Sequence, residues 1–429
     1  MVTKTEGIDQ REKGGYRPST DQDDQRPVTV PVEEPRLLDL MFDQDAYDRL
    51  REQPVSKARH FDGSPAWLVT RFADAMALLA DPRVSSNPAH QVRVKTTTAP
   101  GIPAEYLRLL GRSMALMDAP QHTWIRSLVA RSFTARRVQQ LRGRIGELAG
   151  SLLDELAPRG EVDLLADFAY PLPFAVISDL LGMPPEFRGP WREAVEGMMW
   201  GPWEQLADCA RAMAGYATRL VEVRRATPGD DLLSALTHGG GDDRLDDDDL
   251  AAVVISIINA GHETTAQLIT NGMLALLTHP DQLSLLRADP ELLPGAVEEM
   301  LRYWGPAELA TPRFTTEPVQ IGDVTIPAGE TIQIIWGAVN KDESKFTGAQ
   351  QFNVARRDNT HLAFGHGMHY CLGAALARTE GEVVFGTLLR RFPDLALAVP
   401  ADQVQWKRGH PRGINRLVSL PVRLGPPAS

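Results

Sequence analysis

The chain has 429 residues, of which 43% are hydrophobic, and carries a formal net charge of −11 at pH 7. This length and composition suit a globular protein with a large core, and the negative charge argues against nucleic-acid binding as the main activity. Two cysteines, Cys209 and Cys371, exclude a disulfide framework and favour a reducing cytoplasm. We expect neither secretion nor a membrane span, because no leader pattern and no run of about 18 apolar residues occurs.

Residues 1–34 are rich in Asp, Gln, Thr, Lys and Pro, a composition typical of a disordered tail. No linker or shift in composition interrupts residues 35–425. We therefore expect a single domain over residues 35–429.

Helix dominates the predicted secondary structure. Apolar residues recur at spacings of three and four over residues 72–82, 136–157 and 204–226, which predicts three amphipathic helices. A longer helix is predicted over residues 246–280, because acidic residues suit its start and its remainder is apolar enough for a central position.

Strand signals are fewer and gather late in the chain. β-branched residues alternate around two turns over residues 318–339, and short strands are predicted near residues 66–70 and over residues 416–424. Strands and helices do not alternate as in a parallel α/β protein. The predicted fold class is mainly α with small β-sheets.

The predicted central helix contains the sequence AGHETT, residues 260–265, which has features uncommon in a helix interior. Glycine costs about 1 kcal/mol relative to alanine there, threonine is also unfavourable, and Glu263 interrupts an apolar segment. A threonine that bonds to a carbonyl one turn earlier would explain the pattern as a kink. Alternatively, Gly261 lets a flat ligand approach the backbone, while Glu263 and Thr264 manage protons beside it.

The sequence VEEMLR places Glu299 and Arg302 three residues apart on a predicted helix. By itself this spacing indicates a surface ion pair that contributes only a few tenths of a kcal/mol.

The sequence FGHGMHYCLG, residues 364–373, puts Cys371 in a glycine-rich loop ahead of a predicted helix. Glycines permit close backbone approach, and amides at a helix start stabilise a thiolate. Zinc would need about four ligands, and there is no second cysteine cluster. A nucleophilic cysteine beside His369 stays open, although nothing else points to acyl transfer. A single thiolate in such a loop suits an axial haem ligand.

Together these features resemble the cytochrome P450 superfamily. Residues 260–265 resemble its oxygen-activation motif, and Glu299 with Arg302 resembles its Glu-x-x-Arg pair. The loop fills every fixed position of its haem-binding signature with Phe364, Gly365, Gly367, His369, Cys371 and Gly373.

Three further matches extend the resemblance to about residues 36–424. Residues 117–138 resemble the bacterial segment whose His and Arg hold a haem propionate, and Arg313 stands where the family has another propionate arginine. Arg356 matches the arginine that completes a buried network with Glu299 and Arg302. The nearest group is that of soluble actinomycete enzymes that tailor macrolides and other polyketides.

The resemblance implies the cytochrome P450 fold, a single triangular haem-thiolate domain, with haem b (iron protoporphyrin IX) as cofactor and O2 as co-substrate. Cys371 would be the axial ligand of the iron, and its thiolate would favour O–O cleavage. The implied cofactor-binding residues are His122, Arg126, Ala260, Gly261, Arg313, Phe364, Gly365, His369, Cys371 and Gly373.

The implied activity is that of a monooxygenase that hydroxylates or epoxidises a secondary metabolite, most closely a macrolide or polyketide. Thr264 and water would pass protons, with Glu263 as the relay acid. Electrons would come from a ferredoxin and an NAD(P)H-dependent ferredoxin reductase. We expect a cytoplasmic monomer that binds a small-molecule substrate and neither nucleic acid nor membrane.

By the same analogy, substrate contacts come from residues 84–117, 198–203, 307–311 and 413–415 and from the central helix. Three alternatives stay open: a haem protein that does not oxygenate, an enzyme for an amino acid or peptide tethered to a carrier protein, and a steroid or xenobiotic hydroxylase.

Overall fold

The computed structural model describes residues 34–91, 101–238, 244–407 and 413–428. The predicted disordered tail, apart from Glu34, lies outside these residues. By their contacts, residues Pro35–Ser429 cluster as one unit.

The four periodic segments form helices close to their predicted limits. They are α3 (Phe72–Ala80), α6 (Ala135–Leu156), α9 (Leu206–Ala226) and α11 (Asp247–Thr278). α11 begins where the side chain of Asp246 accepts a hydrogen bond from the backbone amide of Asp249 (2.7 Å), and three acidic residues occupy its first turn.

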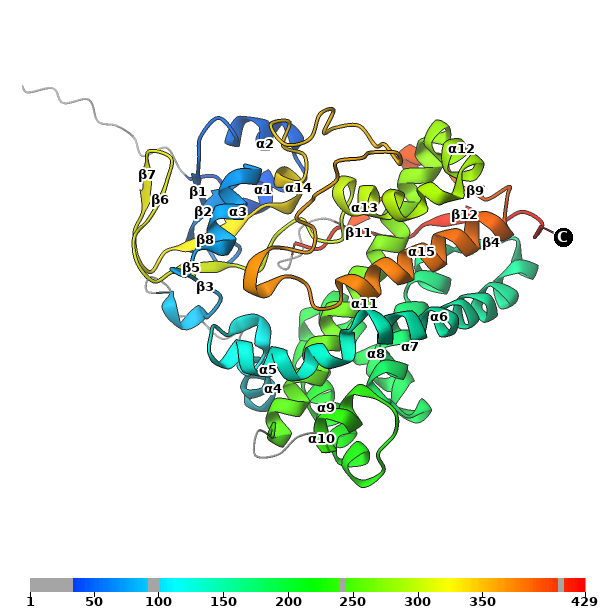
Figure 1. The fold of residues 1–429 in the computed structure, drawn as a ribbon, viewed down its shortest axis with the longest axis horizontal. Coiled ribbons are helices and arrows are strands. Elements are labelled where there is room, and N and C mark those ends of the chain that lie inside the picture. Colours follow the sequence, from blue (N-terminus) through cyan, green and yellow to red (C-terminus); the bar gives the residue numbers. More distant parts are fainter. Residues whose placement is uncertain (1–33, 92–100, 239–243, 408–412, 429) are drawn as a thin grey trace, which may run out of the picture. The chain divides into compact units, whose positions relative to one another are not determined.

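α11 runs through the middle of the helical part and packs against α15, which in turn packs against α6 (Figure 1). It also packs against α7 and α9. Because it is enclosed by these helices, it is buried on most faces and need not be amphipathic. The further helices are α1 (Leu37–Leu40), α2 (Gln44–Leu50), α4 (Ala104–Leu110), α5 (Gln121–Ala130), α7 (Pro171–Leu181), α8 (Pro185–Trp200), α10 (Leu232–His238), α12 (Pro280–Ala288), α13 (Leu293–Tyr303), α14 (Trp336–Val339) and α15 (Ala374–Arg391).

The strands form small sheets, and the largest lies with the β6–β7 hairpin beside the helical part (Figure 1). Its order is β1 (Ser56–Arg59), β2 (Pro65–Val69), β8 (Thr331–Ile334), β5 (Arg313–Thr315) and β3 (Val84–Ser85). β2 pairs with β8 in parallel. The smaller sheets are formed by β6 (Val319–Ile321), β7 (Val324–Ile326), β4 (Glu161–Asp163), β12 (Pro421–Arg423), β9 (Ala396–Leu397), β10 (Trp406–Lys407) and β11 (Arg416–Leu417).

The predicted fold class, mainly α with small β-sheets, is confirmed. One detail of the strand prediction is wrong: residues 318–339 contain three strands, but the chain turns into α14 after Ile335. The β-branched alternation ends at that residue, and Trp336 starts the helical turn.

One segment, Leu164–Leu181, has the length and apolar composition of a membrane-spanning helix. It consists of the π-helical turn η5 (Leu164–Ala169) and α7, and 72% of it is buried inside the protein. This burial is what a central core helix shows.

Candidate active site

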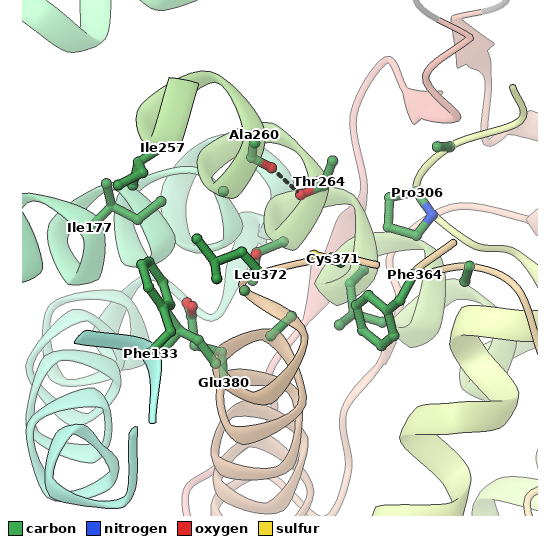
Figure 2. A pocket seen from close by; sticks show the side chains of 18 of the residues that line it. Phe133, Ile177, Ile257, Ala260, Thr264, Pro306, Phe364, Cys371, Leu372 and Glu380 are labelled. Carbon is green, nitrogen blue, oxygen red and sulfur yellow. Dashed lines mark hydrogen bonds between the residues drawn. The ribbon is translucent and has the colours of Figure 1, made fainter. Parts of the chain in front are cut away.

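A cavity of about 310 Å³ lies between α11 and the loop before α15 (Figure 2). Ala260, Gly261 and Thr264 of α11 line one side, and Phe364 and Cys371 of the loop line another. Most other lining residues are aliphatic or aromatic. A mainly apolar cavity with a few polar groups is typical of a cofactor or substrate site.

Glycines allow the cysteine loop to fold back on itself. Gly365 and Gly367 have φ of 71° and 72°, the left-handed region that favours glycine. A Cβ atom on Gly367 would lie 2.6 Å from the carbonyl oxygen of Leu79. The backbone amide of Cys371 donates a hydrogen bond to the carbonyl of Phe364 (2.8 Å), which closes the loop and brings the sulfur to the cavity.

The Cys371 thiol has opposing influences on its ionisation. Burial raises its pKa, whereas the backbone amide of Gly373 and the guanidinium groups of Arg126 and Arg378 act in the other direction. Amides and cations around a sulfur favour a thiolate ligand. Among the described side chains, no hydrogen bond joins Cys371 to His369, and no three His, Cys, Asp or Glu side chains gather around a bare metal ion. The nucleophile and zinc interpretations therefore find no support.

Three basic side chains predicted to hold propionates, His122, Arg126 and Arg313, lie close to this loop together with His369 of the haem-binding signature. His122 and Arg313 are buried, and Arg126 and His369 are half-buried. His122 is 1% exposed, and neither of its ring nitrogens has a hydrogen-bond partner. Its ring lies 4.2 Å from that of His369 between centroids. The guanidinium of Arg313 bonds only to two backbone carbonyls, and that of Arg126 bonds to the carbonyl of Tyr370. Within the described part of the chain, none of the four forms an ion pair.

The pKa values of these basic side chains indicate that negative charge is missing around them. Burial lowers the pKa of Arg313 to about 10. Burial, and next the charge of Arg313, lower the pKa of His369 to about 3, and burial also lowers the pKa of His122. Arg313 is thus a buried cation that forms no ion pair among the described residues, although the nearby charge of Asp118 acts to raise its pKa. Such a cation is unfavourable without a counterion. Carboxylates of a bound ligand would complete this cluster, so these residues fit the propionates of haem.

The Thr264 hydroxyl lines the cavity and donates a hydrogen bond to the carbonyl of Ala260 (2.5 Å; Figure 2). This is the bond that the kink interpretation requires, although α11 stays helical from Asp247 to Thr278. The two interpretations of this motif are therefore compatible at Thr264.

The side chain of Glu263 points away from the cavity. It is 2% exposed and does not line the cavity. Its carboxylate accepts hydrogen bonds from Tyr170 Oη (2.7 and 2.8 Å), Trp200 Nε1 (3.1 Å) and Gln267 Nε2 (2.9 Å). The relay role of Glu263 stays a prediction, and sequence reasoning missed the residues that hold it.

Glu299 lies at the centre of a buried network. Its side chain and that of Arg302 are 0% exposed. Arg302 donates to both carboxylate oxygens (2.7 and 2.8 Å), and Arg356 Nε donates to one of them (3.0 Å). The backbone amide of Asn353 and the side chain of Asn359 also donate to Glu299. The surface-pair interpretation is wrong, because α13 turns this pair into the core.

The cavity also contains a carboxyl that the sequence prediction did not include. Glu380 of α15 lines it, and its Oε2 has no hydrogen-bond partner. Burial raises the pKa of this carboxyl to about 8. No local signal in the sequence marks it, because Glu380 stands between Arg378 and Glu382 in a mixed, charged stretch of the predicted helix.

The predicted substrate segments differ in where they lie. Met114 and Ala307 line the cavity, whereas the residues of 198–203 and 413–415 do not, and residues 92–100 are outside the described part. Trp200, from residues 198–203, donates a hydrogen bond to Glu263 instead.

Comparison with known proteins gives one consistent family. The family model described as "Cytochrome P450" matches residues 198–396. Cytochrome P450 107B1 of Saccharopolyspora erythraea is 44% identical over 407 residues, which cover 92% of this chain and 99% of the relative. The 6-deoxyerythronolide B hydroxylase of the same organism is 43% identical, with coverage of 88% and 95%.

A solved structure has the same fold. The cytochrome P450 PksS of the Bacillus subtilis bacillaene polyketide synthase superposes with a TM-score of 0.81 at 35% identity. The match covers 89% of this chain and 96% of PksS.

Proposed function

This chain belongs to the cytochrome P450 family of haem-dependent monooxygenases, and we propose that it hydroxylates or epoxidises a macrolide or a related polyketide. The relatives that act on such compounds support this substrate class: one is named for hydroxylating 6-deoxyerythronolide B, and another belongs to a polyketide synthase system. The observation that carries the proposal is that the Cys371 thiol and the Thr264 hydroxyl line the same mainly apolar cavity.

The residues of the cavity would hold haem b. Cys371 would supply the thiolate that ligates the iron, and Ala260, Gly261, Phe364, Gly365 and Gly373 would form the walls and turns of the haem site. When bound, haem supplies the activation of O2 and the insertion of one oxygen atom into the substrate. His122, Arg126, Arg313 and His369 would hold its propionate carboxylates.

Protein side chains orient the substrate, exclude water and deliver protons. Ile177, Leu180 and Leu268 make the lining apolar, which keeps bulk water from the reacting atoms. The Thr264 hydroxyl donates its hydrogen bond to the Ala260 carbonyl. Its oxygen is therefore left to accept a hydrogen bond from a proton donor in the cavity. Glu263 precedes it in α11 and supplies protons to this position.

Electrons come from a separate ferredoxin and its NAD(P)H-dependent reductase. The catalytic unit is a single domain over residues 35–429, and it works as a cytoplasmic monomer on a small-molecule substrate, without nucleic acid or membrane.

Optical titration of the haem-loaded protein tests the substrate class. We expect 6-deoxyerythronolide B and related macrolactones to shift the Soret band from the low-spin to the high-spin position and to yield oxygenated products by mass spectrometry. A panel of steroids and carrier-bound amino acids serves as the comparison. A shift and turnover with members of that panel, and none with any macrolactone, would contradict the proposal.

A further inference from the structure

The buried carboxylate of Glu263 is held by neutral donors. Among the described residues, its oxygens accept hydrogen bonds only from Tyr170, Trp200 and Gln267. Within the described residues, no Arg, Lys or His forms an ion pair with Glu263. This is uncommon for a glutamate that is only 2% exposed, because buried charges are normally paired.

A cation, Arg416, lies on the other side of two of these donors. The guanidinium of Arg416, from β11, lies 4.4 Å from the ring centroid of Trp200 and 5.0 Å from that of Tyr170. No hydrogen bond or ion pair of Arg416 is present among the described residues, and its Nε is buried without a partner. The same two aromatic residues therefore contact the carboxylate through their polar atoms and the cation through their ring faces.

This arrangement balances charge without a direct contact. A cation over an aromatic face is attracted to the ring, and it makes the ring's O–H or N–H a stronger donor. Lys407 adds a second cation 5.0 Å from the Trp200 ring. Hydrogen bonds to neutral donors are weaker than bonds within an ion pair, so the carboxylate is restrained but can exchange its partners.

We propose that Tyr170 and Trp200 are positioning residues for proton delivery: they orient Glu263 and keep its carboxylate out of a direct ion pair with Arg416. The inference rests on the proposed role of Glu263 as proton donor. If either donor were lost, the carboxylate could turn to the guanidinium. A glutamate in a buried ion pair is fixed in the ionised form, and each proton transfer would then require breaking that pair.

The test uses peroxide formation, which needs no knowledge of the substrate. Haem-loaded protein with NADPH and a surrogate ferredoxin and reductase reduces O2 with two electrons and two protons to hydrogen peroxide, and the rate is measured in H2O and D2O. Trp200→Phe and Tyr170→Phe keep an aromatic ring at each position and remove the donors. We expect each to slow the reaction about tenfold and to enlarge the solvent isotope effect, with Glu263→Gln as the lower limit.

Rescue distinguishes positioning from a merely structural role. In Trp200→Phe combined with Arg416→Gln, the competing cation is gone, so the rate and the isotope effect should return toward the parental values. Infrared difference spectra provide a readout besides activity. The Glu263 carboxylate band, identified by its loss in Glu263→Gln, should move in Trp200→Phe and move back in the double variant.

Two matched controls exist in the chain. Trp67 donates its indole N–H to Glu330 (3.3 Å) with Lys57 over its ring at 4.8 Å, and Tyr47 donates its hydroxyl to the buried Glu308. Trp67→Phe and Tyr47→Phe remove the same donor types outside the site and should leave the rate unchanged.

Parental isotope effects in both Trp200→Phe and Tyr170→Phe would overturn the inference, and so would a failure of Arg416→Gln to reverse the effects. If one Phe variant does not fold, the other decides. An incorrect macrolide assignment would leave this assay unaffected, since O2 is the only oxidant in it.

Discussion

Replacing Glu299 by glutamine should remove a substantial part of the stability of the folded chain. The change keeps the shape of the side chain but leaves Arg302, with a side chain that is 0% exposed, and Arg356, at 9%, without their shared carboxylate. Breaking a buried ion pair by removing one partner costs about 3–5 kcal/mol. Domains are typically stable by only about 5–15 kcal/mol, so we expect a marked loss of folded, haem-containing protein.

The neighbouring residue provides the control. Glu298 also accepts two hydrogen bonds from an arginine, Arg378 (2.7 and 2.9 Å), and lies 3.3 Å from His361 Nε2, but the side chains of Glu298 and Arg378 are 24% and 34% exposed. Partly exposed pairs contribute about 1 kcal/mol or less. Urea unfolding should therefore give a much lower midpoint for Glu299→Gln than for Glu298→Gln, with similar slopes. Equal midpoints for the two variants would refute the reasoning from burial.

Three further results are expected. Thr264→Ala should keep the haem spectrum and substrate affinity but divert electrons to hydrogen peroxide, which the ratio of product to NAD(P)H consumed will show; a parental ratio would remove the proton-relay role. Arg313→Ala should weaken haem binding about 10- to 150-fold in a haem-transfer assay, because a charge-assisted bond contributes ~1.5–3 kcal/mol; unchanged transfer would contradict the propionate site. For Glu380, burial raises the pKa from 4.5 to about 8. The free energy of unfolding of the parent should therefore fall, relative to that of Glu380→Gln, as pH rises through this interval, by up to about 1.4 kcal/mol per pH unit. Parallel pH profiles of the two proteins in urea unfolding would contradict this.

Local patterns in the sequence were sufficient to predict where the long helices begin and end. Residues 246–280 predicted α11 to within two residues at its end, because acids at the start and an apolar run are properties of the segment itself. β4, in contrast, spans only Glu161–Asp163 and exists because it pairs with β12 near the other end of the chain. A three-residue segment carries too little alternation to be recognised alone.

The site was predictable where motifs are contiguous and not where partners are distant. Cys371 and Thr264 could be identified from their own segments, and the structure brings both to one cavity. The hydrogen-bond partners of Glu263 could not be identified from the sequence. Tyr170 and Trp200 come from the ends of other helices, and no local signal links them to α11. Burial, which decides the role of Glu299, is likewise set by packing.

The most direct test of the account is the carbon monoxide difference spectrum of the reduced protein, measured for the parent, Cys371→Ser and Cys209→Ser. We predict that the parent and Cys209→Ser show the Soret band of a thiolate-ligated haem, after which the family is named, and that Cys371→Ser lacks it while haem is still bound. A Cys371→Ser protein that keeps the thiolate band would contradict the assignment of Cys371 as the haem ligand.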